Sequence, residues 1–149
     1  MPVGDVKIST PICFDAFSPE IIQKMVLNGA NLIVLSGNLA WFGKSNAADY
    51  LEMITRWRSL ENRVPVVFAS NSGYSLYWDA GGQVLNKRTK LFEEGHLSAV
   101  MELAAYNSLY RENSKWLLWL YSMLSLIAFG YLIQYREKTR ISQDCASDL

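Results

Sequence analysis

The fold of this chain is decided by residues 6–20, whose sequence is V-K-I-S-T-P-I-C-F-D-A-F-S-P-E. The residues Val6–Ile12 predict a strand, and Cys13 stands directly after it. A helix is expected after Ser18, because a hydroxyl that can cap a helix is followed by Pro19 at the first helical position and by the acidic Glu20. A strand that leads through a cysteine into a helix is the start of an α/β unit.

The same alternation continues along the chain. After the first helix ends at Asn28-Gly29, short apolar runs and helical spacing follow one another. The predicted elements are a strand at 32–35, a helix at 47–60, a strand at 64–69, a hairpin of strands 74–79 and 83–86 around Gly81-Gly82, and a further strand at 97–103. We therefore expect an α/β unit of roughly 110 residues, in the order β-α-β-α-β followed by a hairpin.

Charge and cysteine content exclude several classes of protein. The 149 residues have a formal net charge of +0 and a pI of about 6.6, so the chain lacks the basic surface of a nucleic-acid-binding protein. The two cysteines, Cys13 and Cys145, lie on opposite sides of a long apolar run, and we expect no disulfide between them. His96 is expected to be solvated, and no residues have metal-ligand or phosphate-loop spacing, so no metal or other cofactor is predicted.

An uncharged apolar run extends from Trp116 to Tyr135. About 20 residues at a rise of about 1.5 Å span the roughly 30 Å hydrocarbon core of a bilayer, so a transmembrane helix is predicted, with a buried core helix as the alternative. Arg136, Lys138 and Arg140 follow closely, which by the positive-inside rule predicts a cytoplasmic carboxyl terminus and an outward-facing globular part. The amino terminus does not resemble a cleavable signal peptide. We divide the chain into a globular part at 1–113, a transmembrane helix at 114–136 and a cytoplasmic tail at 137–149.

Cys13 has two interpretations. A lone cysteine after an apolar strand is often a small buried hydrophobic residue. A cysteine at the carboxyl end of a strand, just before a helix, also fits a nucleophile, because open α/β sheets bind ligands at such ends and a helix N-terminus favours the thiolate.

Four segments then carry a resemblance to a known family. They are T-P-I-C-F-D at 10–15, G-A-N-L-I-V-L-S-G-N-L-A-W-F-G-K-S at 29–45, R-S-L-E-N-R-V-P at 58–65 and S-N-S-G at 70–73. In this order they resemble the second half of the nitrilase, or carbon–nitrogen hydrolase, superfamily. The A-W-F-G-K-S segment and the transmembrane helix that follows are similar, more narrowly, to the apolipoprotein N-acyltransferases of the bacterial inner membrane.

The resemblance, which covers about residues 5–138, implies both a fold and an activity. The fold would be part of a nitrilase-type α-β-β-α sandwich, followed by one transmembrane helix. The activity would be transfer of a fatty acyl group from a phospholipid donor, through a cysteine thioester, to the lipidated N-terminal cysteine of an apolipoprotein acceptor. No cofactor is implied, and the globular part would face the periplasm.

The resemblance also implies roles for individual residues. Cys13 would be the nucleophile, and Phe14, Trp41 and Phe42 would form the acyl or substrate pocket. Phe14 stands in place of a tyrosine that is more familiar after the nucleophile.

Three further residues, Asp15, Asn38 and Glu61, would support the active site. Asp15 replaces a glutamate, and Leu39, after Asn38, replaces an aspartate. For Glu61 a solvated or ion-paired structural role remains an alternative. The Asn71–Gly73 turn is interpreted as a backbone device, because glycine tolerates positive φ.

The family mechanism also needs a general-base glutamate and an oxyanion-stabilising lysine that precede the cysteine by a long stretch. Twelve residues precede Cys13, and Lys7 would lie about 20 Å from it along one strand. One interpretation is therefore a membrane-bound acyltransferase part that a separate amino-terminal half completes. A second is a non-catalytic truncated remnant or binding module of the nitrilase fold. A soluble nitrilase-type amidase is a third, weakened by the transmembrane helix.

Overall fold

The computed structural model describes residues 2–103 and 106–147, and the surroundings of side chains in 4–103 and 106–136. The strands are β1 (Pro2–Val3), β2 (Val6–Ser9), β3 (Leu32–Gly37), β4 (Val66–Ser70), β5 (Leu76–Trp78) and β6 (Val84–Leu85). The helices are α1 (Pro19–Leu27), α2 (Ala47–Asn62) and α3 (Leu109–Ser147), and two 3₁₀ turns lie at Cys13–Phe17 and Ala40–Phe42. The chain forms two compact units, Met1–Arg111 and Glu112–Leu149.

The six strands form one sheet in the order β1-β2-β3-β4-β5-β6. Strands β2, β3 and β4 are parallel, whereas β1, β5 and β6 pair with their neighbours antiparallel. Helices α1 and α2 supply the crossovers between the parallel strands, as the predicted β-α-β-α-β order requires. The carboxyl ends of β2, β3 and β4 therefore meet at one edge of the sheet.

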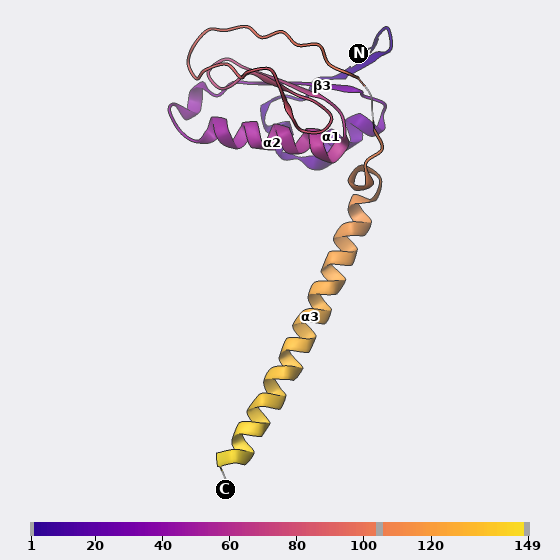
Figure 1. Ribbon diagram of the computed structural model, residues 1–149, viewed down its shortest axis with the longest axis vertical. Helices are drawn as coiled ribbons and strands as arrows, with labels where there is room; N and C mark the ends of the chain where they lie inside the picture. Colours follow the sequence, from indigo (N-terminus) through magenta and orange to yellow (C-terminus); the bar gives the residue numbers. More distant parts are fainter. Residues whose placement is uncertain (1, 104–105, 148–149) are drawn as a thin grey trace. The chain divides into compact units, whose positions relative to one another are not determined.

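Helices α1 and α2 cover one face of the sheet (Figure 1). The side chains on this face are almost fully buried, and they form two adjoining apolar clusters. One consists of Ile22, Val26, Ile33, Val64, Val66, Leu76 and Trp78, and the other of Ala16, Leu35, Leu39, Ala48, Leu51 and Phe68. The Trp78 indole N–H donates to the Thr55 hydroxyl at 3.0 Å, so the polar atom of this core aromatic is satisfied.

The opposite face of the sheet is less completely covered. Val34, Val67 and Tyr77 lie side by side on it through the strand register, and all three are half-buried, as is Leu32. The Tyr77 hydroxyl donates to the carbonyl oxygen of Leu97 at 2.6 Å, which brings the chain after β6 against this face. An apolar, partly covered face is what half of a sandwich would present.

Two sequence predictions need correction. The strand predicted at 97–103 does not form. Its contacts with the hairpin are made by side chains, as when the Asn86 amide donates to the Ser98 carbonyl at 3.1 Å. The strand predicted at Val6–Ile12 ends at Ser9. Pro11 has no N–H to donate, and pairing resumes only as an isolated bridge between Ile12 and Ser36.

Helix α3 belongs largely to the second unit and is described by itself. It has non-helical dihedral angles at Asn113, where φ is −126°. Its segment Leu109–Arg136 has 28 residues and includes a stretch of 18 residues with a mean hydropathy of 1.8, so it is long and apolar enough to cross a membrane. This length and composition agree with the predicted transmembrane helix. Cys145 lies outside the residues whose side chains are described, so the predicted absence of a disulfide to Cys13 stays a prediction.

Candidate active site

The candidate site lies where the three parallel strands end. Cys13 follows β2, Asn38 follows β3 and Asn71 follows β4. Parallel strands present their carboxyl ends at the same edge of a sheet. Cys13, Asn38 and Asn71 therefore come to one edge, although Cys13 and Asn38 are 25 positions apart in sequence and Asn38 and Asn71 are 33 positions apart. Such an edge is where open α/β sheets bind their ligands.

Cys13 occupies a strained backbone position. Its φ is +47°, in the left-handed region that residues with a Cβ rarely adopt. The turn that follows is held by Asp15, whose Oδ2 accepts from the Ile12 N–H at 2.8 Å while its own N–H donates to the Ile12 carbonyl at 3.0 Å. The predicted supporting residue Asp15 thus fixes the turn that carries the half-buried Cys13.

Cys13 opens into an apolar pocket of about 200 Å³. The pocket is lined from three elements, namely the turn of Cys13, the loop after β3 and the amino end of α2. Its lining residues are Cys13, Phe14, Phe17, Leu39, Phe42, Ala47, Tyr50 and Leu51. The structure therefore brings the predicted pocket residues Phe14 and Phe42 to Cys13, and the rings of Phe14 and Phe17 stack with centroids 5.2 Å apart.

Trp41 does not line this pocket. It lies beside Phe42 in the 3₁₀ turn Ala40–Phe42, and 88% of its surface is exposed to solvent. Consecutive residues of a tight turn point in different directions, so only one of the two aromatic rings can face the cysteine.

The loop after β3 is tied to the loop after β4 by two asparagines. Asn38 Oδ1 accepts from the Ala40 N–H at 3.1 Å and from the Asn71 amide at 2.9 Å. Asn71 Oδ1 in turn accepts from the Leu39 N–H at 3.2 Å. The predicted residue Asn38 is therefore at the site, and so is Asn71, for which the sequence predicts only a turn.

Leu39, which the resemblance sets at the position of an aspartate, is a wall of the pocket that is 4% exposed. A Cβ placed on Gly73 would lie 2.5 Å from Leu39 Cδ1, so the absence of a side chain at Gly73 makes room for the leucine. The S-N-S-G segment thus serves the site through packing as well as through Asn71. Gly73 needs no positive φ, unlike the expectation for that turn.

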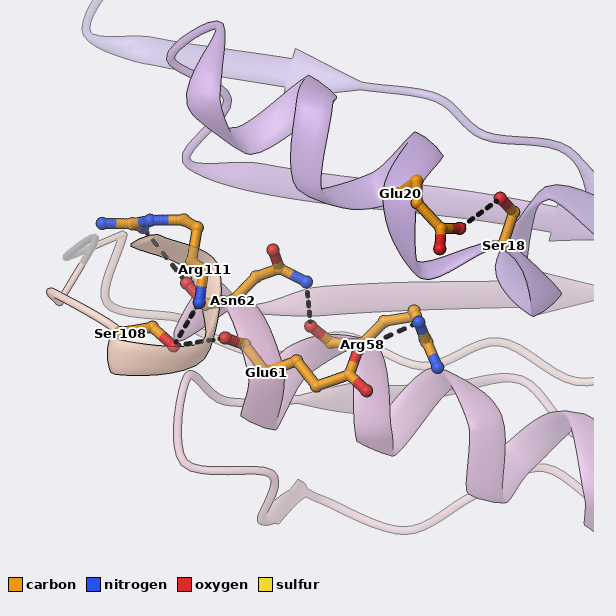
Figure 2. Close-up of polar contacts among 7 residues, drawn as sticks. All are labelled: Ser18, Glu20, Arg58, Glu61, Asn62, Ser108 and Arg111. Atoms are coloured by element: carbon orange, nitrogen blue, oxygen red, sulfur yellow. Dashed lines mark hydrogen bonds and ion pairs between the residues drawn. The ribbon is translucent and has the colours of Figure 1, made fainter. Parts of the chain in front are cut away.

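Glu61 is not brought to the Cys13 pocket. The pocket includes Ala47 at the amino end of α2, and Glu61 lies fourteen residues further along, about 21 Å along the helix axis. Its carboxylate pairs with Arg58 at 2.9 Å, and its backbone carbonyl accepts from the Ser108 hydroxyl (Figure 2). Burial raises the pKa of Glu61, an effect that the Arg58 charge partly offsets.

The comparisons with known proteins agree with this geometry. Residues 1–111 match the family model described as carbon–nitrogen hydrolase. The chain belongs to the carbon–nitrogen hydrolase family.

This carbon–nitrogen hydrolase chain is similar to curated apolipoprotein N-acyltransferases. It is 34% identical to the one from Geobacter metallireducens over 74% of this chain and 21% of the relative. It is 29% identical to the one from Photobacterium profundum over 87% of this chain and 25% of the relative. The chain thus spans about a fifth to a quarter of the length of these relatives.

A solved structure supports the fold. The crystal structure of a carbon–nitrogen hydrolase from Helicobacter pylori G27 matches 67% of this chain and 41% of that protein, with a TM-score of 0.59 and 20% sequence identity. The prediction of a nitrilase-type α/β fold is therefore confirmed.

The ionisable groups lining the pocket of this carbon–nitrogen hydrolase chain are the Cys13 thiol and the Tyr50 phenol. Lys7 points away from it, since its Nζ lies 3.5 Å from the position of a Cβ on Gly29, near the amino end of β3. His96 is exposed, as predicted. Within the described residues no cluster of histidine, cysteine, aspartate and glutamate could hold a metal ion.

Proposed function

We propose that this chain is part of a membrane-bound N-acyltransferase that carries a fatty acyl group on Cys13. The observation that carries the proposal is the position of the Cys13 thiol, on a strained turn at the ends of parallel strands and at an apolar pocket of about 200 Å³. An acyl chain needs such a pocket next to the reacting sulfur. The similarity to apolipoprotein N-acyltransferases supplies the substrate class.

The proposed reaction has two half-reactions. The Cys13 thiolate attacks the ester carbonyl of a phospholipid, a C–S bond forms, and the C–O bond breaks as the lysophospholipid leaves with the proton. The amino group of a lipidated N-terminal cysteine then attacks the thioester, a C–N bond forms, and the thiol recovers a proton as the C–S bond breaks. The net result is an amide on the apolipoprotein.

This chemistry requires a general base and an oxyanion donor, which the described lining of the pocket does not supply. Removal of one oxyanion donor costs about 10² to 10³ in rate in other enzymes. We propose that a separate amino-terminal half provides both groups. It would pack its own sheet on the half-buried face around Val34, Val67 and Tyr77, which completes an α-β-β-α sandwich.

We also propose a membrane arrangement. Residues 1–113 form the carboxyl-terminal part of the hydrolase domain, 114–136 cross the bacterial inner membrane and 137–149 form a cytoplasmic tail. The helix Leu109–Arg136 supports the span by length and composition. The basic residues after it support a periplasmic hydrolase part.

One observation favours a second function, a non-catalytic remnant or binding module. The pocket lining contains neither a carboxylate nor a lysine, and a remnant would be expected to lack them. The two proposals differ in whether Cys13 can be acylated.

The experiment that tests the proposal is acylation of Cys13 followed by intact mass. The detergent-solubilised chain is incubated with a fluorescent phospholipid, alone and with a co-expressed amino-terminal half of an apolipoprotein N-acyltransferase, and Cys13→Ser is the control. A thioester that needs both Cys13 and the partner is the expected result. Absence of an adduct in both mixtures contradicts the enzyme and favours the remnant.

A further inference from the structure

We propose that Asn71 and Asn38 together are positioning residues that set which acyl chains the Cys13 pocket accepts. This inference rests on the proposed function and concerns a residue, Asn71, that is absent from the pocket lining. Asn71 follows β4, whereas the pocket is lined by residues that follow β2 and β3 and by the start of α2. It acts on the pocket through the loop after β3.

The first step is the interlocked geometry of the two amides. Asn38 Oδ1 receives the Asn71 amide N–H at 2.9 Å, and Asn71 Oδ1 receives the Leu39 N–H at 3.2 Å. Asn38 Oδ1 also receives the Ala40 N–H at 3.1 Å. Two consecutive backbone N–H groups of the loop are thus held by one pair of side chains, which we call the asparagine latch.

The second step connects the latch to the pocket wall. Leu39, whose N–H is held by the latch, lines the pocket, and so does Phe42, whose own N–H donates to the Leu39 carbonyl at 3.1 Å. A change in the position of the Leu39 backbone therefore moves two wall residues together. The turn that carries Cys13 is held separately by the bonds between Asp15 and Ile12, and Cys13 has no hydrogen bond to either asparagine among those described.

The third step is that the Leu39 side chain, which belongs to a buried apolar cluster, is held by packing and by no directional bond among those described. Gly73 leaves space against the Leu39 side chain, so Leu39 packs there without a directional bond. Ala40 and the residues of 41–46 are all exposed to solvent. The latch holds the N–H groups of Leu39 and Ala40, and we expect it to set the depth of the wall. Loss of the latch is therefore expected to widen or close the pocket without altering the turn that carries Cys13.

The test measures how the alkylation rate of Cys13 depends on alkyl-chain length. Full-length chain in detergent, with Cys145→Ser in every protein, is treated with N-ethylmaleimide and N-hexylmaleimide, and modification is followed by intact mass. Each methylene that enters the pocket is expected to raise the rate roughly fourfold. Partition of the probes into detergent is the same for every variant, so it cancels when rate ratios are compared.

We expect Asn71→Ala to lower the hexyl-to-ethyl rate ratio by at least about fivefold, the effect of little more than one methylene, while the ethyl rate changes less than about twofold. Asn38→Ala should act alike, and the double variant should add little, because both changes open one latch. Asn71→Asp keeps the acceptor for the Leu39 N–H but loses the donor to Asn38 Oδ1, so its ratio should lie between those of wild type and Asn71→Ala. Asn31→Ala is the matched control. Asn31 also uses its amide in two hydrogen bonds, to backbone groups at 2.7 and 2.9 Å, but near the amino ends of β2 and β3.

The outcomes separate the two proposals. Wild-type protein with no chain-length dependence would contradict the acyl pocket, and with it the proposed function. A wild-type dependence that both Asn71→Ala and Asn38→Ala leave unchanged would overturn the latch alone. Equal loss of the ethyl and hexyl rates in folded variants, judged by circular dichroism, would also overturn it, because it would place the effect on the thiol rather than on the pocket.

Discussion

The two ends of helix α2 differ in their surroundings, which are apolar at the amino end and polar at the carboxyl end. At the amino end, Ala47, Tyr50 and Leu51 face the apolar pocket of Cys13. At the carboxyl end, Arg58 and Asn62 are buried polar residues that contact one another and, through the Asn62 carbonyl, Arg111 (Figure 2). One helix therefore lines the Cys13 pocket at its amino end and is hydrogen-bonded to the start of α3 at its carboxyl end. We call the polar contacts at the carboxyl end, which involve Arg58, Glu61, Asn62 and Arg111, the joint. We expect stability to be sensitive at the joint and Cys13 chemistry to be sensitive at the wall.

Substitution of Arg58 is expected to have the largest effect on the free energy of unfolding. Its side chain is 9% exposed and pairs with Glu61 at 2.9 Å, so Arg58→Ala leaves a shielded carboxylate without its counter-charge. We expect the free energy of unfolding to fall by about 3 kcal/mol, measured by urea unfolding in detergent with near-ultraviolet circular dichroism.

Lys90→Ala is the matched control for this change. Lys90 and Glu93 form another ion pair three residues apart, at 3.2 Å, but their side chains are 79% and 59% exposed. Loss of an exposed pair should cost less than about 1 kcal/mol. Equal effects of the two substitutions would contradict the contrast between a buried joint and a solvated surface.

The wall end is tested by Gly73→Ala. The new Cβ would lie 2.5 Å from Leu39 Cδ1, so either the leucine or the turn must shift, at a cost of about 1–3 kcal/mol. Unlike Arg58→Ala, this change should also alter the alkylation rate of Cys13. Gly95→Ala, whose Cβ would meet Thr89 at 3.4 Å, should leave both measurements near wild type. An unchanged Cys13 rate in a destabilised Gly73→Ala protein would disconnect this turn from the pocket.

A smaller effect is expected at Ser108, which joins the chain before α3 to the end of α2. Its hydroxyl donates to the Glu61 carbonyl and accepts from the Arg111 N–H at 3.3 Å. Ser108→Ala should lower the free energy of unfolding by about 1 kcal/mol without changing Cys13 alkylation. Ser45→Ala, which removes a long, exposed contact to the Ala47 N–H, provides the comparison. A Ser108 variant as stable as wild type would mean that the joint does not depend on this hydroxyl.

The smallest expected effect is a pH dependence from Glu61. Burial raises its pKa above the ordinary value of 4.5, so the folded state keeps the proton to a higher pH than the unfolded state does. The free energy of unfolding should therefore fall as pH rises from about 4.5 through the folded pKa. Glu61→Gln should remove this slope, as seen by urea unfolding at a series of pH values. Stability that depends on pH in the same way in wild type and in Glu61→Gln would contradict the raised pKa of Glu61.

Much of the fold could be predicted because its signals are local. Runs such as Leu32–Leu35 must be covered on both faces, and Gly29, with φ of +97°, follows the end of α1 as the sequence indicates. The residue at which α2 ends was harder to predict from the sequence. Arg63 adopts a left-handed φ of +54° although it is not glycine, because its N–H completes a bond to the Ser59 carbonyl at 2.8 Å.

The site was predicted only in part, for a different reason. Strand order places Cys13 and Asn38 at one edge, so their meeting follows from topology. Which of Trp41 and Phe42 faces the cysteine depends on the direction of side chains in a tight turn, and the place of Glu61 depends on the length of α2. A sequence motif predicts neither the side-chain direction nor the helix length. The hydrogen bond between the Leu39 N–H and Asn71 can be identified only in the folded structure.

The left-handed conformation of Cys13 also bears on how such a chain changes over generations. Glycine at this position would be released from a strain of about 1–2 kcal/mol, so drift under selection for folding alone would favour replacing the cysteine. At a φ of +47° a cysteine does not give the highest folding stability that this position allows. Among random substitutions selected only for thermal resistance, Cys13→Gly should therefore be enriched, while a screen for acyl transfer should reject it.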